Sequence, residues 1–197
     1  MKKIFVILGK SSSGKDSIAR ELLNNADELN LSSYVPYTTR PIRQGEKENI
    51  DYFFVSDEEF DSLIENNKML EYRAYNTVNG VWRYGTVYDE QLQTDKNILM
   101  LLTLEGYDSL ISSNIINKDN IIPIYIQVDD GVRLTRALHR EKSQTNPNYK
   151  EMCRRFLADS EDFSEDKILK AGITKRFYNY NFSKCMKKII NYIKSFE

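Results

Sequence analysis

We predict an α/β fold, in which helices flank a mainly parallel sheet, because two patterns alternate along the 197 residues. Three segments, Ile4–Leu8, 98–102 and 121–128, are continuous apolar runs, as expected of strands that are buried on both faces. Stretches with helical periodicity separate them, and such alternation favours parallel strands joined by helices. The chain is long enough for one well-buried core that carries small inserts.

Helical periodicity is clearest near the two ends of the chain. Apolar residues after Lys15 fall on one face of a predicted helix. Near the C-terminus they recur at steps of three and four, which predicts a final helix. The apolar positions of these two faces are Ile18, Ala19, Leu22 and Leu23, and Phe182, Cys185, Met186, Ile189, Ile190, Ile193 and Phe196.

The region 33–94 has a different character. It is rich in Tyr, Thr and Arg, and the pair Asn79-Gly80 favours a hairpin turn. Its predicted elements are a small helix at 57–66 and two hairpin strands at 70–77 and 81–86. We therefore expect 33–94 to form an insert on the core.

The predicted organisation is a single domain with three parts. The core comprises 1–32, 95–139 and 151–197, and 33–94 is the insert. The stretch 142–150 is polar and contains proline, which indicates a mobile loop between two helices. We assign it to a lid at 140–150.

A Gly-rich stretch, GKSSSGKD, follows the first predicted strand and opens a helix, which is the context of a phosphate-binding loop. Gly9 and Gly14 allow the tight wrap that turns backbone N–H groups inward, and the helix N-terminus adds its positive end. Lys15 supplies a cation for the β- and γ-phosphates. The loop therefore predicts binding of a nucleoside triphosphate by Gly9, Lys10, Ser11, Ser12, Ser13, Gly14, Lys15, Asp16 and Ser17.

Asp16 departs from the usual loop, which ends in Lys followed by a Ser or Thr that contacts magnesium. Its carboxylate could contact Mg²⁺ directly or through water, since hard cations favour oxygen ligands. Alternatively, it is an acidic residue at a helix start, stabilised by the helix dipole. The residues leave both interpretations open.

Composition excludes several classes of function. The 29 acidic and 28 basic residues nearly balance, which argues against a dedicated nucleic-acid binder. No apolar run approaches the roughly 20 residues of a membrane span. The start, MKKIFVILG, is expected to be a buried strand rather than a signal peptide, because Gly and Lys interrupt its apolar run. We expect small-molecule partners, with no nucleic acid and no membrane.

The two cysteines and the single histidine are not expected to carry chemistry. Cys153 and Cys185 lie in separate predicted helices, and two reduced thiols suit a cytoplasmic protein. Only His139 is present to activate a thiol, and we expect it on a helix surface.

A second signature is YTTRPIRQGEKENIDYFFVS, residues 37–56. Arg40 and Arg43 flank an extended stretch that proline restrains, and two guanidinium groups at this spacing suit the oxygens of one phosphate. Tyr52 adds a phenolic hydroxyl. Taken alone, a solvated loop with two arginines would explain the stretch equally well.

This stretch resembles the acceptor-binding segment of guanylate kinases, whose usual form is S-x-T-T-R-x-P-R-x-G-E-x-x-G-x-D-Y-x-F-V. The resemblance covers nearly the whole chain in the expected order. Further matches are Glu71 in MLEY, Tyr84-Gly85-Thr86, the lid arginines Arg136, Arg140 and Arg155, and Asn179 in FYNYN.

The resemblance implies a P-loop kinase fold and an ATP- and Mg²⁺-dependent phosphotransferase that acts on GMP or dGMP. Glu71 would accept hydrogen bonds from guanine N1–H and the 2-amino group, and Thr86 could donate to O6. Asn179 would lie near the adenine of ATP. The acceptor phosphate would be held by Arg40, Arg43, Tyr52 and Tyr84, and transition-state charge by Lys15, Arg40, Arg136, Arg140 and Arg155.

Four departures from the family pattern concern the base and the metal. Pro36 stands where a Ser usually touches guanine. Leu101 and Thr103 lie where the family usually has acidic residues. The span from Glu71 to Tyr84 is longer than usual, and Asp16 replaces Ser or Thr. A missing partner for a buried base edge costs about 1–3 kcal/mol, enough to weaken discrimination between bases.

Two other functions fit parts of the pattern. A related kinase of ribose 1,5-bisphosphate, or of another nucleoside monophosphate, would need no Ser at Pro36, although Glu71 and Thr86 argue against it. A non-catalytic interaction module of the same fold is the other alternative. The intact Gly9, Gly14 and Lys15 argue against that one.

Overall fold

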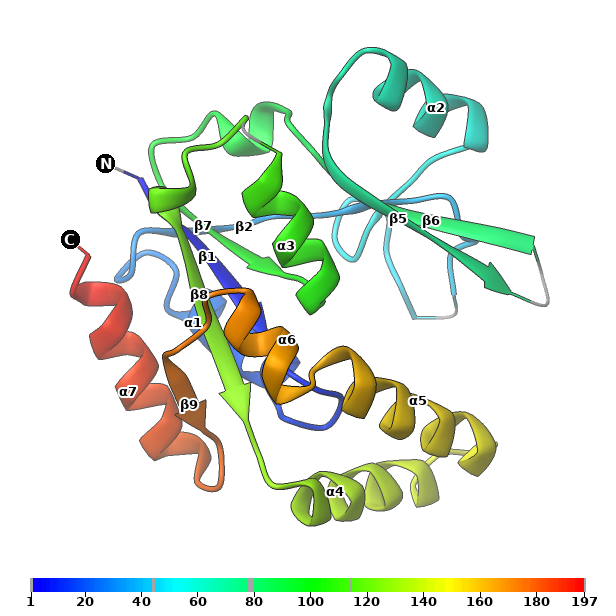
Figure 1. The fold of residues 1–197 in the computed structure, drawn as a ribbon, viewed down its shortest axis with the longest axis vertical. Coiled ribbons are helices and arrows are strands. Elements are labelled where there is room, and N and C mark those ends of the chain that lie inside the picture. The colour runs from blue at the N-terminus through cyan, green and yellow to red at the C-terminus, as the bar shows by residue number, and fades with distance from the viewer. Residues whose placement is uncertain (1, 44, 78–79, 114, 197) are drawn as a thin grey trace.

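The computed structural model describes residues 2–43, 45–77, 80–113 and 115–196. A five-stranded parallel sheet forms the centre, and a four-stranded sheet lies beside it (Figure 1). The central order is β2-β7-β1-β8-β9. Its strands are β1 (Ile4–Leu8), β2 (Leu31–Ser33), β7 (Asn97–Leu101), β8 (Ile121–Gln127) and β9 (Arg176–Tyr178).

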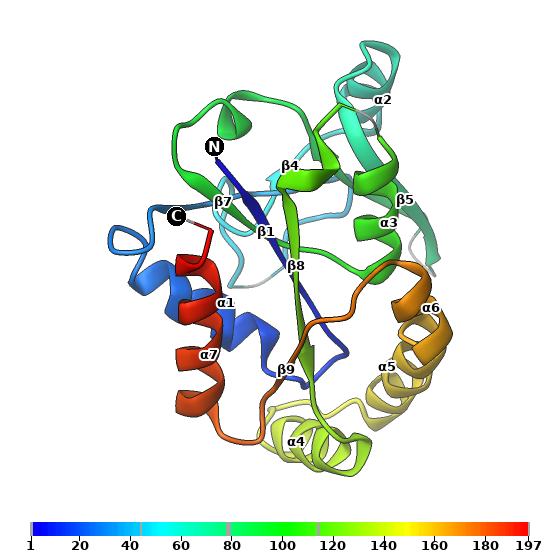
Figure 2. The same cartoon turned by 60° about the vertical axis from the view of Figure 1, so that its left-hand side comes forward.

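Helices cover both faces of the central sheet, which confirms the predicted α/β fold (Figure 2). Side chains of a strand alternate between faces. Ile4, Val6 and Leu8 of β1 therefore join one core cluster, and Phe5 and Ile7 join the other. The first face packs against α3 (Leu104–Ser112) and α6 (Glu165–Lys170), and the second against α1 (Lys15–Asn24) and α7 (Phe182–Lys194).

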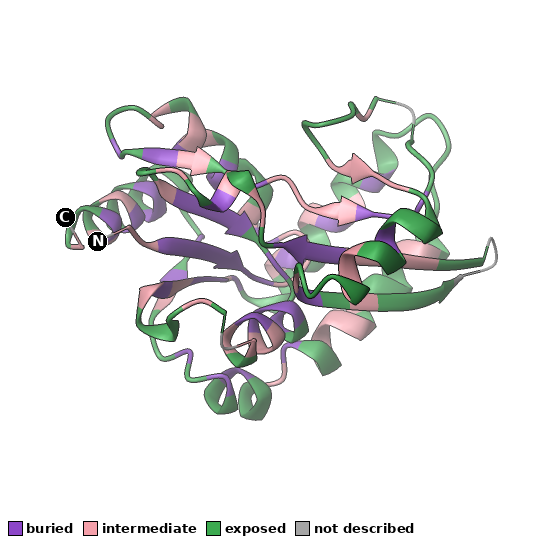
Figure 3. Cartoon of the chain, turned by 90° about the horizontal axis from the view of Figure 1, so that it is seen from above, coloured by how far each residue is buried: buried purple, intermediate pink, exposed green. Residues whose placement is uncertain are grey.

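The smaller sheet has the order β4-β3-β6-β5 and is built from residues 37–87. Its long ribbon carries exposed residues toward the far end, unlike the buried central strands (Figure 3). Its elements are β3 (Tyr37–Thr38), β4 (Phe53–Phe54), α2 (Asp57–Glu65), β5 (Met69–Thr77) and β6 (Gly80–Val87). A capping box between Ser56 and Glu59 begins α2.

Two helices, α4 (Asp130–Lys142) and α5 (Tyr149–Asp162), extend from the end of β8 as a pair. Helix α4 ends at Lys142 and α5 begins at Tyr149, so residues 143–148, within the predicted lid at 140–150, connect the two helices. The Asn148 N–H donates to Glu141 and so ties the end of this connection to α4. Two short 3₁₀ turns, Glu90–Leu92 and Lys118–Asn120, complete the chain.

The predicted elements agree with the structure within a few residues. The strands at 98–102 and 121–128 are β7 and β8, the helix at 57–66 is α2, and the hairpin strands are β5 and β6. Of the predicted turn, Asn79 lies outside the described residues, whereas Gly80 begins β6. Among the described residues, no helix has the length and apolar character of a membrane span.

Candidate active site

The phosphate loop connects the end of β1 to the start of α1. Gly14 has a φ of 90°, in the left-handed region, and a Cβ there would lie 2.5 Å from Asn179 Nδ2. A Cβ on Gly9 would lie 2.8 Å from the Ile126 carbonyl oxygen. Both glycines are therefore required by close approach of other chain segments as well as by loop geometry.

Asn179 and Arg136 hold this loop from outside. Asn179 is buried, and its Nδ2 donates to the Ser13 carbonyl at 2.8 Å. Arg136 Nη2 donates to the Asn179 carbonyl at 2.8 Å, and Nη1 lies 3.5 Å from the Ser13 carbonyl. The structure thus brings together three sequence-predicted residues from the loop, α4 and the segment after β9.

Unsatisfied polar atoms mark the same place. Within the described chain, three buried side-chain oxygens have no hydrogen-bond partner: Ser12 Oγ, Ser13 Oγ and Asn179 Oδ1. Buried polar atoms normally find partners, so exceptions suggest a polar ligand. This cluster fits the polar groups of a nucleotide.

Two of the three predicted lid arginines line a cavity of about 220 Å³ beside the loop. Ser11 and Ser12 line it on one side, and Arg140 and Arg155 line it from α4 and α5. Arg155 Nε also donates to Glu151 at 2.8 Å. Hydrogen bonds from Arg154 and Arg155 lower the pKa of Glu151 to about 2. The cavity therefore combines cations with residues of the phosphate loop, and the carboxylates of Glu141 and Glu151 also line it.

Sequence analysis missed a buried ion pair at the base of α4 and α5. Arg133 is fully buried, and its Nη2 lies 3.0 Å from Asp159 Oδ2. Asp159 accepts the Ser11 N–H at 2.7 Å, and Arg133 Nε donates to the Ser11 carbonyl at 3.0 Å. Both backbone polar groups of Ser11 are thus held by this pair. Arg133 lies one helical turn before Arg136, a spacing that could have suggested a shared face.

On the acceptor side, Arg40 is held by an ion pair within the insert. Its guanidinium donates to Glu46 Oε2 at 2.7 Å and to Oε1 at 2.6 Å. It also lies 4.9 Å from the Tyr52 ring centroid and 5.5 Å from that of Phe54. Hydrogen bonding by Arg40 lowers the pKa of Glu46. Glu46 thus positions the predicted phosphate-binding arginine, a role that the sequence did not reveal.

Aromatic residues continue this site toward the outer end of the ribbon. The Tyr52 and Tyr84 rings meet edge-on, with centroids 5.9 Å apart, and Tyr84 meets Tyr75 similarly at 5.8 Å. Arg43 is exposed and lies 5.7 Å from the Trp82 ring centroid. The predicted phosphate ligands Arg40, Arg43, Tyr52 and Tyr84 therefore gather on one region of the insert.

Glu71 lies at the inner end of the same ribbon, beside the core. Its side chain is fully buried, and Oε1 accepts the Thr86 hydroxyl at 2.7 Å. An ionised carboxylate can only accept, so the single Thr86 hydroxyl proton points to Glu71 in this arrangement. Burial raises the pKa of Glu71, while Arg73 and Thr86 oppose the rise.

Arg73 is the second residue that sequence analysis missed. Its Nε donates to Glu71 Oε2 at 3.1 Å, and its Nη1 donates to Thr103 Oγ1. Residues two apart on a strand share a face, so the position of Arg73 relative to Glu71 was a usable signal. Thr103, noted for its missing acid, is the N-cap of α3 and receives this arginine.

Asp16 could serve as a metal ligand. Its carboxylate is 69% exposed, and both oxygens lie 3.1 Å from Lys15 Nζ. The described residues contain no cluster of three or more metal-binding side chains. Mg²⁺ in phosphate sites commonly uses one or two carboxylates, substrate phosphates and water. One accessible carboxylate fits that requirement, and the position of Asp16 in the first turn of α1 equally fits an acidic residue stabilised at a helix start.

The chain matches known proteins along most of its length. The family model described as guanylate kinase matches residues 1–167. The guanylate kinase of Malacoplasma penetrans is 33% identical over 156 residues, which cover 78% of this chain and 76% of that protein. The guanylate kinase of Mesoplasma florum is 37% identical over 127 residues, which cover 63% of this chain and 40% of that protein. The crystal structure of guanylate kinase from Anaplasma phagocytophilum covers 98% of this chain and 85% of its own, with a TM-score of 0.67 and 19% identity, and supports the fold.

Proposed function

Because the chain belongs to the guanylate kinase family and is a nucleoside monophosphate kinase, we propose that it transfers the γ-phosphoryl group of ATP to GMP or dGMP. The observation that carries this proposal is the buried Glu71–Thr86 pair. It lies on the same ribbon as Tyr84, which contacts Tyr52 near Arg40. One insert thus offers a base acceptor and a group of phosphate ligands.

The donor site is the phosphate loop with its supports. Backbone N–H groups of the loop and Lys15 bind the ATP phosphates. Asn179 lies against the loop, where its unpaired Oδ1 can accept a hydrogen bond from the nucleotide. Arg136, Arg140 and Arg155 surround the donor from the lid side, at 140–150 and the adjoining helices.

The acceptor site reads guanine through Glu71. A carboxylate offers about four lone-pair positions. Thr86 Oγ1 donates to Oε1, Arg73 Nε donates to Oε2, and Arg73 Nη2 lies 3.5 Å from Oε1. Oε2 therefore keeps a free position for one N–H of guanine, and a second N–H would take the position on Oε1 that the long Arg73 Nη2 contact occupies. Adenine has no N1–H, so the same carboxylate disfavours AMP.

Phosphoryl transfer needs positioning and positive charge rather than a covalent nucleophile. An oxygen of the acceptor phosphate attacks the γ-phosphorus, and ADP leaves with the bridging oxygen. Arg40 and Arg43 orient the acceptor phosphate, while Lys15 and the lid arginines stabilise charge on the transferred group. Closing of the insert, 33–94, and of the lid would exclude water and so suppress ATP hydrolysis.

Mg²⁺ belongs to this proposal as the ion that neutralises phosphate charge. Asp16 would hold it, together with phosphate oxygens and water. In that case the Asp16 carboxylate leaves Lys15, which becomes free to bind the phosphates. The cytoplasmic location and the absence of nucleic-acid partners stay predictions.

An acceptor screen tests the function. ATP is supplied with each nucleoside monophosphate in turn and with ribose 1,5-bisphosphate, and ADP release is measured. We expect turnover with GMP and dGMP and little with AMP, CMP or UMP. Turnover of the sugar bisphosphate without any guanine nucleotide turnover would replace the proposed acceptor. Lys15→Met is the control for contaminating kinases.

A further inference from the structure

Arg73 joins the acceptor insert to the core at the point where Glu71 is buried. It lies on β5, and its Nη1 donates to Thr103, which begins α3. The Arg73 side chain is only 11% exposed. A Cβ on Gly106 would lie 3.1 Å from Arg73 Cζ, so the first turn of α3 packs closely on the guanidinium. The arginine is therefore fixed by both parts of the molecule.

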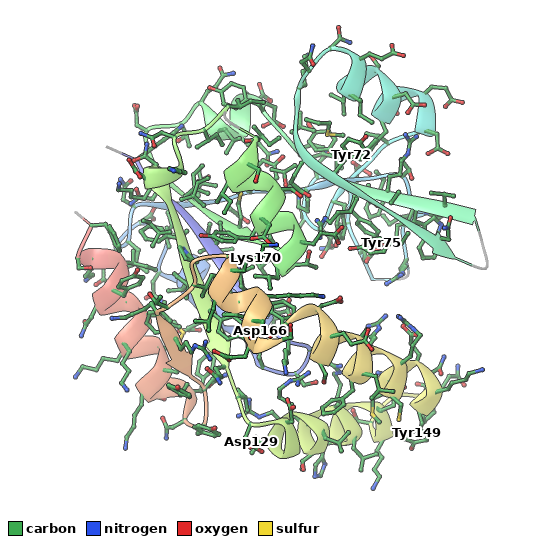
Figure 4. All side chains as sticks on the ribbon, viewed as in Figure 1. Tyr72, Tyr75, Asp129, Tyr149, Asp166 and Lys170 are labelled. Atoms are coloured by element: carbon green, nitrogen blue, oxygen red, sulfur yellow. The ribbon has the colours of Figure 1, made fainter. Side chains whose placement is uncertain are left out.

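The ribbon places Arg73 beside the substrate-facing groups. Arg73 pairs with Tyr84 across the ribbon, and Glu71 pairs with Thr86. Directly opposite residues and residues two apart share one face of a sheet. Figure 4 shows Tyr72 on the α2 side of β5 and Tyr75 on the other side, turned toward α5. Glu71, Arg73 and Tyr75 thus occupy the face that carries the acceptor site.

The ion pair between Arg73 and Glu71 affects the charge state of the Glu71 carboxyl group. A fully buried carboxylate tends to become protonated unless a cation or hydrogen-bond donors stabilise its charge. A protonated carboxyl keeps one oxygen as a donor and loses acceptor capacity. Reading both N1–H and the 2-amino group requires two acceptor oxygens, and hence the ionised form.

We propose that Arg73 is a positioning residue that determines base selectivity by holding Glu71 ionised and oriented toward guanine. This inference rests on the proposed guanylate kinase function. In this proposal Arg73 does not contact guanine itself. It acts through Glu71, and Thr103 and Gly106 fix the guanidinium at the correct distance.

The surroundings of Glu71 define the direction of the pH effect. Burial raises its pKa, and the opposing contributions come from Arg73 on the same strand and Thr86 on β6. Glu105 on α3 raises the pKa as well, and Tyr34, before β3, is a buried phenol nearby. Without Arg73 the pKa of Glu71 would rise further. Guanine recognition would then be lost at a higher pH as the solution is acidified.

The test compares Arg73→Met with wild type across mildly acidic to alkaline pH, using GMP and IMP as acceptors. IMP lacks the 2-amino group, so the GMP-to-IMP ratio of kcat/KM reports the second acceptor contact. At neutral pH we expect that ratio to fall about tenfold or more, the contribution of a hydrogen bond to a charged group. The loss should appear mainly in KM for GMP, and the acid limb should move to higher pH.

Two further variants separate this role from simple stabilisation. Arg73→Lys keeps the positive charge and should restore most of the acid limb. Arg83→Met is the matched control, because Arg83 lies on the same ribbon and pairs with Asp57 and Asp61 rather than with Glu71. It should leave the GMP-to-IMP ratio and the pH profile unchanged. An equal shift in both methionine variants would overturn the proposal.

A direct titration keeps the inference separate from the proposed function. The carboxyl carbon of Glu71 is followed by NMR in wild type and in Arg73→Met, without nucleotide. A higher pKa in the variant is expected, and an unchanged pKa refutes the inference whatever the enzyme phosphorylates. If GMP is turned over but the ratio is insensitive to Arg73, only the inference fails. If wild type turns over no guanine nucleotide, the proposed function fails.

Discussion

The acceptor insert and the donor side of this kinase hold their cations in different ways. In the insert, Arg40 pairs with Glu46, Arg73 with Glu71, and Arg83 with Asp57 and Asp61. Every one of these carboxylates belongs to the insert itself. On the donor side, Lys15 pairs with the exposed Asp16, and Arg155, which is 52% exposed, pairs with Glu151.

The difference suggests a division of tasks between the two regions. Ion pairs and aromatic contacts fix the insert arginines before a substrate arrives, so the acceptor site is largely preorganised. On the donor side, Arg140 and Arg155 lie exposed on α4 and α5, which suits the movement that closure over a nucleotide would require. The exceptions are Arg133, which is buried and paired with Asp159, and Arg136, which donates to the Ser13 and Asn179 carbonyls. The Arg133–Asp159 pair holds Ser11.

The largest expected effect is a loss of stability when the buried Arg133–Asp159 pair on the donor side is broken. Arg133→Met leaves Asp159 without its buried cation, and breaking a buried ion pair destabilises by about 3–5 kcal/mol. Urea unfolding should show this loss. Arg154→Met is the matched control on α5, since Arg154 is 65% exposed, and it should cost no more than about 1 kcal/mol. Similar losses in both variants would mean that Arg133 does not anchor the lid.

The second largest effect is expected from Lys15→Met, which should impair the donor side without affecting the acceptor side. Lys15→Met should lower kcat by roughly 10²–10³-fold, the usual effect of removing one group that stabilises transition-state charge. Because Lys15 belongs to the donor side, GMP binding measured by calorimetry should be nearly unchanged. A parallel loss of GMP affinity would contradict the division between donor and acceptor sites.

The smallest of the three effects is expected on the acceptor side, in the KM for GMP. Arg43→Ala removes an exposed cation that contacts Trp82. A hydrogen bond to a charged group contributes about 1.5–3 kcal/mol, so KM for GMP should rise tenfold or more while KM for ATP changes little. Steady-state kinetics with each substrate varied in turn measures this split. Equal changes in both KM values would assign Arg43 to a general electrostatic role.

The predictable parts of the molecule were those that depend on local pattern. Ile4–Leu8 is apolar throughout because both faces of β1 are covered, and that signal needs no knowledge of the partners. The phosphate loop follows from glycines placed between a strand and a helix. The resemblance identified Glu71, and the structure then showed it buried beside Thr86.

The unpredictable parts depend on residues that are distant in sequence. Asp159 meets Arg133 across 26 positions, and Arg73 meets Thr103 across 30. No periodicity encodes such pairs, because tertiary packing alone brings them together. The direction of the Thr86 hydroxyl was equally hidden, since it depends on the charge of its neighbour. Sequence therefore predicted residues for the two sites, whereas the supports behind them required the fold.

The close contact between Gly14 and Asn179 has a consequence for synthesis of the chain. The phosphate loop leaves the ribosome before Asn179, whose side chain holds the Ser13 carbonyl and lies 166 positions later. Strand β9, which precedes Asn179, pairs with β8 at the edge of the central sheet. The loop can therefore reach its final form only after Asn179 has been translated. Nucleotide binding by the finished loop would then follow the synthesis of Asn179 rather than precede it.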